Sequence, residues 1–189
     1  MSLPHIPRPV KLLFAILSAP GAPVEDLERR IALEFGPIDH RSEEFEFIHS
    51  DYYVAEMGPR LRKWFVSCAP LIDPGTLASI KLHTNRLEQH YARPGGGGRT
   101  VNIDPGWLDP SRVVLATGKD YAHRIYVGGG IYEEITLIYR RRPPGYEPLA
   151  WTYPDYRSAD ALRFFATARQ TCLAQREAGK SPFISRKSA

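Results

Sequence analysis

The sequence lacks most of the features that mark secreted, membrane-spanning or cysteine-metal proteins. Its two cysteines, Cys68 and Cys172, lie far apart and belong to no CxxC pair, so we expect neither a disulfide framework nor a cysteine zinc site. No window approaches the roughly 18 uninterrupted apolar residues of a membrane span. The proline-rich start and the short apolar run at residues 12–17 do not form a secretion signal. These absences predict a cytoplasmic protein with two buried thiols.

Motifs of common nucleotide-binding and hydrolytic sites are also missing. A phosphate-binding Walker loop requires GxxxxGK[ST] between a strand and a helix, whereas the glycines at 95–98 lead through Arg99 and Thr100 into a predicted strand. The glycines at 128–130 likewise lie between two predicted strands. The chain contains no GxSxG, HExxH or paired CxxC. The sequence therefore identifies no cofactor, and it leaves open whether the protein is an enzyme.

The composition is that of a folded domain. An apolar fraction of 43% with 11% aromatic residues argues against disorder. The net charge of +4 is mild and comes largely from residues 140–142 and 176–187, so it gives little support to a nucleic-acid partner. We predict an extended arm at 1–10, a single α+β domain at 11–177 and a frayed basic tail at 178–189.

The periodicity of the apolar residues predicts the order of the elements. The continuous apolar run at 11–17 is typical of a central strand buried on both faces. Apolar residues recur at helical spacing over 24–35, after the capping pair Asp73-Pro74 and after Ser158. Further strands are predicted at 45–53, 62–68, 100–104, 113–117, 121–127 and 131–140, with a turn at Pro105-Gly106 and a β-hairpin around the glycines at 128–130.

The order of these elements indicates the fold. Up to Asp104 it is strand, helix, strand, strand, helix, strand, which is the ferredoxin-like βαββαβ pattern. We therefore predict an α+β fold with helices packed on a mixed or mostly antiparallel sheet. Its ferredoxin-like start is extended by a β-hairpin and a C-terminal helix.

Residues that can carry chemistry crowd between positions 102 and 156, and an earlier helix adds three more. Lys81, Asn85 and Glu88 form a polar stripe beside the apolar face of that helix, which suits either a binding site or a solvated face. Asn102 and Asp104 share one face of their predicted strand. A carboxylate at this place could bind a metal, act as a general base or cap the turn.

The segment 119–124 is the richest local group. If it is a strand from Asp120 on, Asp120 and Arg124 share one face and His123 takes the other. His123 could then be a base, and Lys119 or Arg124 could hold an anionic group. The alternative is a salt-bridged strand edge. No HxxxH or HxH spacing supports a metal site.

Two further segments mix acids with aromatic residues, namely 51–56 and 151–156. Carboxylates beside aromatic rings can have raised pKa values and serve as acids or bases, and Asp155 is one such group. Tyrosine hydroxyls bonded to carboxylates within a core network would give the same pattern.

The combined motifs resemble a known family. They are Phe35-Gly36-Pro37-Ile38-Asp39, Asp51-Tyr52-Tyr53 with Glu56-Met57-Gly58, Ile80-Lys81-Leu82 with Thr84-Asn85, Val101-Asn102-Ile103-Asp104-Pro105-Gly106, Lys119-Asp120-Tyr121-Ala122-His123-Arg124-Ile125 and Trp151-Thr152-Tyr153-Pro154-Asp155-Tyr156-Arg157. This set resembles the bacterial family called domain of unknown function 4416, from about Pro9 to the last helix. The resemblance implies that the polar segments belong to a shared feature. It implies no activity and no catalytic residues.

Three hypotheses follow from these patterns. The first is a polar cleft for a small anionic ligand bearing a phosphate or a carboxylate. Its candidate catalytic residues are Asp104, Asp120 and His123, and its candidate ligand-binding residues are Lys81, Asn85, Asn102, Lys119, Arg124, Glu134 and Asp155. A metal is expected only if two or three carboxylates converge.

The second hypothesis is a module that binds a nucleotide or single-stranded nucleic acid on the aromatic residues Tyr52, Tyr53, Trp107 and Tyr132. The third is a structural or partner-binding protein whose polar network only fixes the fold. The sequence does not indicate the oligomeric state.

Overall fold

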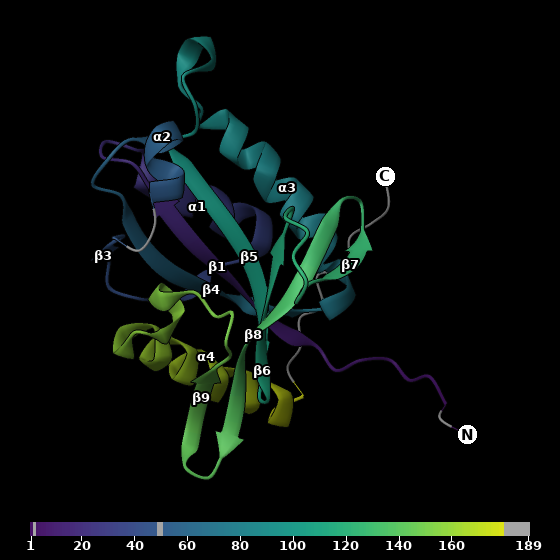
Figure 1. Ribbon diagram of the computed structural model, residues 1–189. Coiled ribbons are helices and arrows are strands. Elements are labelled where there is room, and N and C mark those ends of the chain that lie inside the picture. Colours follow the sequence, from purple (N-terminus) through teal and green to yellow (C-terminus); the bar gives the residue numbers. More distant parts are fainter. Residues whose placement is uncertain (2, 49–50, 180–189) are drawn as a thin grey trace.

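Nine strands form one antiparallel sheet in the computed structural model, which describes residues 1, 3–48 and 51–179 (Figure 1). The main strand order is β2-β4-β1-β5-β6-β8-β7, with β3 paired to β4 and β9 paired to β8. The α+β class and the mostly antiparallel sheet are confirmed, whereas the ferredoxin-like topology stays a prediction. The strands are β1 (Val10–Ser18), β2 (Ile38–Arg41), β3 (Phe45–Glu46), β4 (Arg62–Ile72), β5 (Val101–Asp109), β6 (Arg112–Thr117), β7 (Ile125–Gly128), β8 (Ile131–Arg141) and β9 (Pro144–Pro148).

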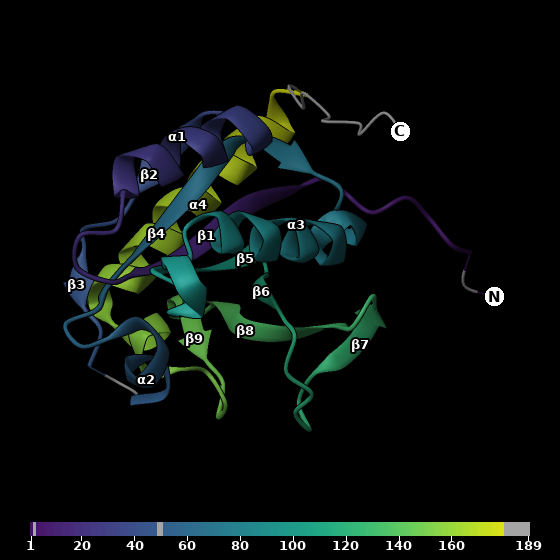
Figure 2. The ribbon, with the colours of Figure 1, turned by 90° about the horizontal axis from the view of Figure 1, so that it is seen from above.

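Helices cover both faces of the sheet (Figure 2). The first and third pack on one face, and the fourth packs on the other. No helix within the described ranges is long and apolar enough to cross a membrane. The helices are α1 (Val24–Phe35), α2 (Val54–Met57), α3 (Leu77–His90) and α4 (Ala159–Glu177), and the short 3₁₀ turns are η1 (Asp51–Tyr53), η2 (Pro74–Thr76), η3 (Pro94–Gly96) and η4 (Pro154–Arg157).

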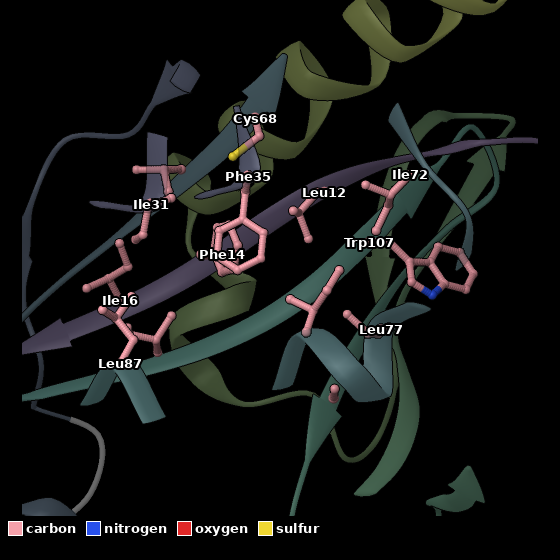
Figure 3. Close-up of a cluster of buried hydrophobic side chains, with 14 of the residues drawn as sticks. Leu12, Phe14, Ile16, Ile31, Phe35, Cys68, Ile72, Leu77, Leu87 and Trp107 are labelled. Atoms are coloured by element: carbon pink, nitrogen blue, oxygen red, sulfur yellow. The ribbon is translucent and has the colours of Figure 1, made fainter. Parts of the chain in front are cut away.

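Strand β1 lies inside the sheet between β4 and β5, and its whole length is buried, as its apolar run predicts. Because side chains alternate along a strand, Phe14 points towards α1 and α3, whereas Leu13 and Ala15 point towards α4. Figure 3 shows the first of these two cores, in which the ring centroids of Phe14 and Phe35 lie 5.0 Å apart. One strand thus supports two hydrophobic cores.

The predicted turn at Pro105-Gly106 is wrong, because β5 continues through both residues. Both residues pair with β1 on one side. On the other side, a Cβ atom on Gly106 would lie 2.5 Å from the carbonyl oxygen of Val114 in β6. The glycine therefore permits a close approach of two strands within the sheet.

Two predicted strands are shorter than expected. The prediction for 45–53 is reduced to β3, and residues 51–53 form η1 instead. The segment 119–124 precedes β7 as a turn, in which the amide of Arg124 donates to the carbonyl oxygen of Tyr121 at 2.9 Å. The predicted strand alternation of Asp120, His123 and Arg124 is therefore wrong. The remaining predicted strands, the hairpin of β7 with β8 and the helix capped by Ser158 are confirmed.

The ends of the described chain are joined by α4. Arg176, near the end of that helix, donates two hydrogen bonds to the carbonyl oxygen of Pro9, at 2.9 and 2.6 Å. Most of the predicted basic tail, residues 180–189, lies outside the described residues. The division into arm, domain and tail stays a prediction.

Candidate functional site

A cleft with a volume of about 540 Å³ lies among α3, the strands β4, β5, β6 and β8, and the turns η1 and η4. This volume suits a small molecule. The cleft gathers most of the predicted site residues in its lining, namely Lys81, Asn85, Asn102, Asp104, Lys119, Arg124, Glu134 and Asp155. Segments far apart in the sequence thus meet at one hollow, as the crowding of polar residues predicts.

The wall formed by α3 and β5 is built on Lys81 and Asp104. Lys81 is only 5% exposed, and its Nζ donates to Asp104 Oδ1 at 3.0 Å and to the Ile103 carbonyl oxygen at 2.8 Å. Asn102 donates its amide to the second oxygen of Asp104 at 2.8 Å, which agrees with their predicted shared face. Burial acts to raise the pKa of Asp104, but the charges of Lys81 and Lys63 and these hydrogen bonds leave it below its usual value. Asp104 is therefore an ionised carboxylate at neutral pH.

Behind this wall, Arg99 holds three elements together. Its guanidinium donates to both oxygens of Glu56 from α2, each at 2.8 Å, and to Glu88 of α3 at 2.6 Å. It also donates to Asn102 of β5 at 3.0 Å. Burial raises the pKa of Glu88, although Lys81, the Ile103 amide and Arg99 act in the opposite direction. Arg99 fixes the position of the wall and fills one side of the cleft.

The opposite wall contains Glu134 of β8, which is 4% exposed. Its Oε2 accepts a hydrogen bond from Arg124 Nε at 2.6 Å and lies 3.1 Å from His123 Nε2. His123 does not line the cleft, and its ring stacks on Trp151 with centroids 5.2 Å apart. The Arg124–Glu134 pair therefore faces the cleft, with His123 on its outer side.

A third charged pair lies deep in the cleft, between Lys63 of β4 and Asp155 of η4. Both side chains are largely buried, and Lys63 Nζ also lies 4.8 Å from the ring centroid of Tyr156. Burial raises the pKa of Tyr156 well above its usual value. Its hydroxyl is therefore protonated at neutral pH.

Lys119 differs from the other cations of the lining. Its Nζ lies 3.6 Å from the ring centroid of Tyr52 and 5.7 Å from that of Tyr53, which is cation–π geometry. Within the described part of the chain, it forms no ion pair with a carboxylate. Lys119 is thus held at the cleft by aromatic faces and keeps its charge available.

Two predicted catalytic residues lie away from the lining. His123 occupies the outer side of Glu134, and Asp120 is exposed, where its charge helps to raise the pKa of Tyr132. The turn at 119–124 explains both positions, because it directs Lys119 and Arg124 to the cleft and leaves the two residues outside. Sequence reasoning also missed Lys63 and Arg99 as site residues. A lysine within the core-forming strand β4 is the signal that could have indicated Lys63.

The aromatic residues proposed as stacking platforms do not form one surface. Trp107 is 8% exposed and belongs to the core of α1 and α3. Tyr132 packs on Tyr126 with ring centroids 5.3 Å apart, away from the cleft lining. Tyr52 and Tyr53 alone border the cleft. This arrangement gives the nucleic-acid hypothesis no continuous platform.

A metal centre finds little support among the described residues. They contain no group of three or more histidine, cysteine, aspartate or glutamate side chains that could hold an ion. Cys68 and Cys172 are free and buried, as predicted, and burial raises the pKa of Cys68 to about 12. The charged groups of the cleft instead pair with one another.

We expect Asp104→Asn to change the acid sensitivity of the protein. A carboxyl with a lowered folded pKa stabilises the fold fully above its unfolded pKa of about 3.9, and this contribution disappears as the pH falls through the folded value. Chemical denaturation should therefore show wild type to be more stable than the variant by about 1 to 3 kcal/mol at pH 7. The difference should shrink towards pH 3. Glu43→Gln is the control, because Glu43 is exposed and forms no ion pair with a described residue. A gap between wild type and Asp104→Asn that stays constant with pH would contradict the expectation.

Comparison with known proteins identifies the chain only at the level of a family. The family model described as "Domain of unknown function (DUF4416)" matches residues 8–171, which include the whole cleft. No curated protein and no solved structure matches the chain.

Proposed function

The chain belongs to the family of domain of unknown function 4416, and we propose that this member binds a small anionic ligand, bearing a phosphate or a carboxylate, in the cleft. The position of Lys119 is the observation that carries the proposal. We retain a cytoplasmic location as a prediction from the sequence.

The other cations of the lining are already neutralised by carboxylates. Lys63 pairs with Asp155 and Lys81 with Asp104. Arg124 pairs with Glu134, and Arg99 with Glu56 and Glu88. Lys119 is the exception within the described part of the chain. An anionic group near its ammonium gains a charge-assisted hydrogen bond without displacing an internal partner.

The aromatic surroundings of Lys119 strengthen the binding of an anion to its ammonium group. The ammonium rests on the rings of Tyr52 and Tyr53, which limit the mobility of the long side chain. Phe47, Tyr153 and Tyr156 add further aromatic lining. Hydrogen bonds are stronger in such a partly apolar hollow than at an open surface.

The chemistry available in the cleft is limited. Of the three predicted proton-transfer residues, Asp104 alone lies in the lining, and its low pKa makes it a proton acceptor of modest strength. We therefore propose ligand binding as the function and keep Asp104 as the residue through which a proton-transfer step would run. His123 has a positioning role, through its contact with Glu134.

Replacing Lys119 by methionine tests the proposal. The variant keeps the aliphatic stem but removes the charge, so anionic ligands should bind about 10- to 100-fold more weakly. The melting temperature of the free protein should change little, since Lys119 forms no ion pair with a described residue. Thermal shifts with inorganic phosphate, simple carboxylates and sugar phosphates measure both effects.

Arg86→Met is the matched control, because Arg86 is an exposed cation on α3 outside the cleft lining. Anions that stabilise wild type should stabilise this variant equally. The proposal fails if no anion stabilises wild type, or if the Lys119→Met protein keeps the full shift.

A further inference from the structure

We propose that the ligand is rich in hydroxyl groups and carries a single anionic group, as sugar monophosphates and sugar acids do. This inference rests on the proposed function and narrows it to a ligand class. It follows from the one cation of the lining that has no carboxylate partner and from the neutral polar groups that have no hydrogen-bond partner.

The pairing of the charges around the cleft leaves one cation, Lys119, free to meet an anionic group. The lining holds five cationic side chains, and five carboxylates meet them, three in the lining and two behind Arg99. The two signs are equal in number, but Glu56 pairs with Arg99, and Glu88 is shared by Arg99 and Lys81. Among the described residues of the lining, Lys119 is therefore the cation without a carboxylate at ion-pair distance. The cations are Lys63, Lys81, Arg99, Lys119 and Arg124, and the carboxylates are Asp104, Glu134, Asp155, Glu56 and Glu88.

A second anionic group would be repelled. Asp104 is ionised, and its side chain keeps 28% of its surface exposed. Its charge acts on both Tyr53 and Tyr156, so it faces the same hollow as these lining residues. Like charges brought together in a partly buried site weaken binding, which disfavours diphosphates and triphosphates.

Three polar groups of the lining have no hydrogen-bond partner and are suited to bind the hydroxyls of a ligand. Asn85 and the hydroxyls of Tyr53 and Tyr156 make no hydrogen bond to any other residue in the described ranges, although all three residues border the cleft. Burial raises the pKa of both tyrosines, so their hydroxyls stay protonated. Hydroxyl and amide groups both donate and accept, as the hydroxyls of a sugar do.

Asp104 supplies the acceptor that completes this arrangement. Each of its oxygens accepts one hydrogen bond, from Lys81 and from Asn102. A carboxylate oxygen has two lone-pair sites, so each oxygen can accept one more. Two neighbouring hydroxyls of a ligand can donate to them. Tyr121 and Tyr153 border the cleft and are 50% and 44% exposed. Arg124 covers one face of the Tyr121 ring at 4.4 Å, and the remaining ring surface can contact the apolar side of a sugar.

Five probes distinguish the ligand classes by isothermal titration calorimetry on the full chain. Glucose 6-phosphate and glucuronate combine one anion with several hydroxyls, and they separate the phosphate source from the carboxylate source. Glucose lacks the anion, phenyl phosphate lacks the sugar hydroxyls, and adenosine triphosphate carries several anionic groups. We expect at least one of the first two to bind about tenfold or more tightly than each of the last three.

Two variants and one control assign the effect to residues. Lys119→Met should abolish the preference for the sugar anion over glucose. Asn85→Ala should reduce the preference for the sugar anion over phenyl phosphate. The control Arg86→Met should leave both preferences unchanged. Far-ultraviolet circular dichroism of each variant verifies that the fold is retained.

The outcomes separate this inference from the proposed function. If phenyl phosphate or the triphosphate binds as tightly as the sugar anions and depends on Lys119, the ligand class is wrong while anion binding stands. If no anion binds more tightly than glucose, both proposals are overturned. If the Asn85→Ala protein still prefers the sugar anion to phenyl phosphate as strongly as wild type does, the proposed role of the Asn85 amide is wrong.

Discussion

Replacing Lys81 by methionine is expected to lower the free energy of unfolding by roughly 3 to 5 kcal/mol. Lys81 is 5% exposed and is the cation that Asp104 and Glu88 share, at 3.0 and 3.9 Å. Its removal leaves Asp104 without its direct ion-pair partner and removes the donor to the Ile103 carbonyl oxygen. Urea denaturation followed by circular dichroism measures the loss.

A second variant tests whether the cause is the uncompensated charge. Lys81→Met combined with Asp104→Leu should be more stable than Lys81→Met alone, because the lone carboxylate is also removed. Lys119→Met provides the control lysine, and its unfolding curve should stay close to that of wild type. A loss below about 1 kcal/mol for Lys81→Met would show that water solvates Asp104 well enough without the pair.

Phe65→Ala is expected to cost a similar amount, about 3 to 5 kcal/mol. Phe65 of β4 is fully buried, and its ring lies 5.1 to 5.6 Å from three others, those of Tyr156, Phe164 and Phe165. The cavity left by the ring would separate β4 from α4 and η4. Because Tyr156 also lines the cleft, ligand affinity should fall together with stability.

Phe65→Leu is the matched variant, since it retains most of the apolar volume and should lose clearly less. Val54→Ala, at an exposed apolar position on α2, should change the unfolding free energy by less than about 0.5 kcal/mol. Equal losses for Phe65→Ala and Phe65→Leu would mean that packing around this ring does not limit stability.

Much of the sheet could be predicted from the sequence because its central strands are rich in apolar residues. Residues 12–17, which form the middle of β1, are all apolar, so they predict a buried strand directly. The apolar residues of α1 recur at helical spacing, which predicts a helix. Strands β2 and β9 lack this signal, since Ile-Asp-His-Arg and Pro-Gly-Tyr-Glu-Pro are short and mostly polar or turn-like. They form because neighbouring strands offer free edges, which is a tertiary effect.

The site could be predicted in part, and the failures have a common cause. Asn102 and Asp104 obey strand alternation, so their shared face was predictable. The turn at 119–124 depends on contacts with β8, so the sequence placed Asp120 and His123 wrongly within a strand. Arg99 follows four glycines that fit no phosphate loop. One of its partners, Glu56 of α2, lies 43 positions away in the sequence, and the other, Glu88, lies on the preceding helix α3.

The central place of β1 bears on how the chain reaches its native state. This strand is formed from residues 10–18, but its partners are β4 and β5, where Lys11 pairs with Leu71 and Leu108. During synthesis its apolar side chains emerge long before either partner exists. Assembly of the sheet therefore waits for distant segments, and such non-local pairing slows folding. We expect newly made chains to depend on chaperones until β5 has emerged.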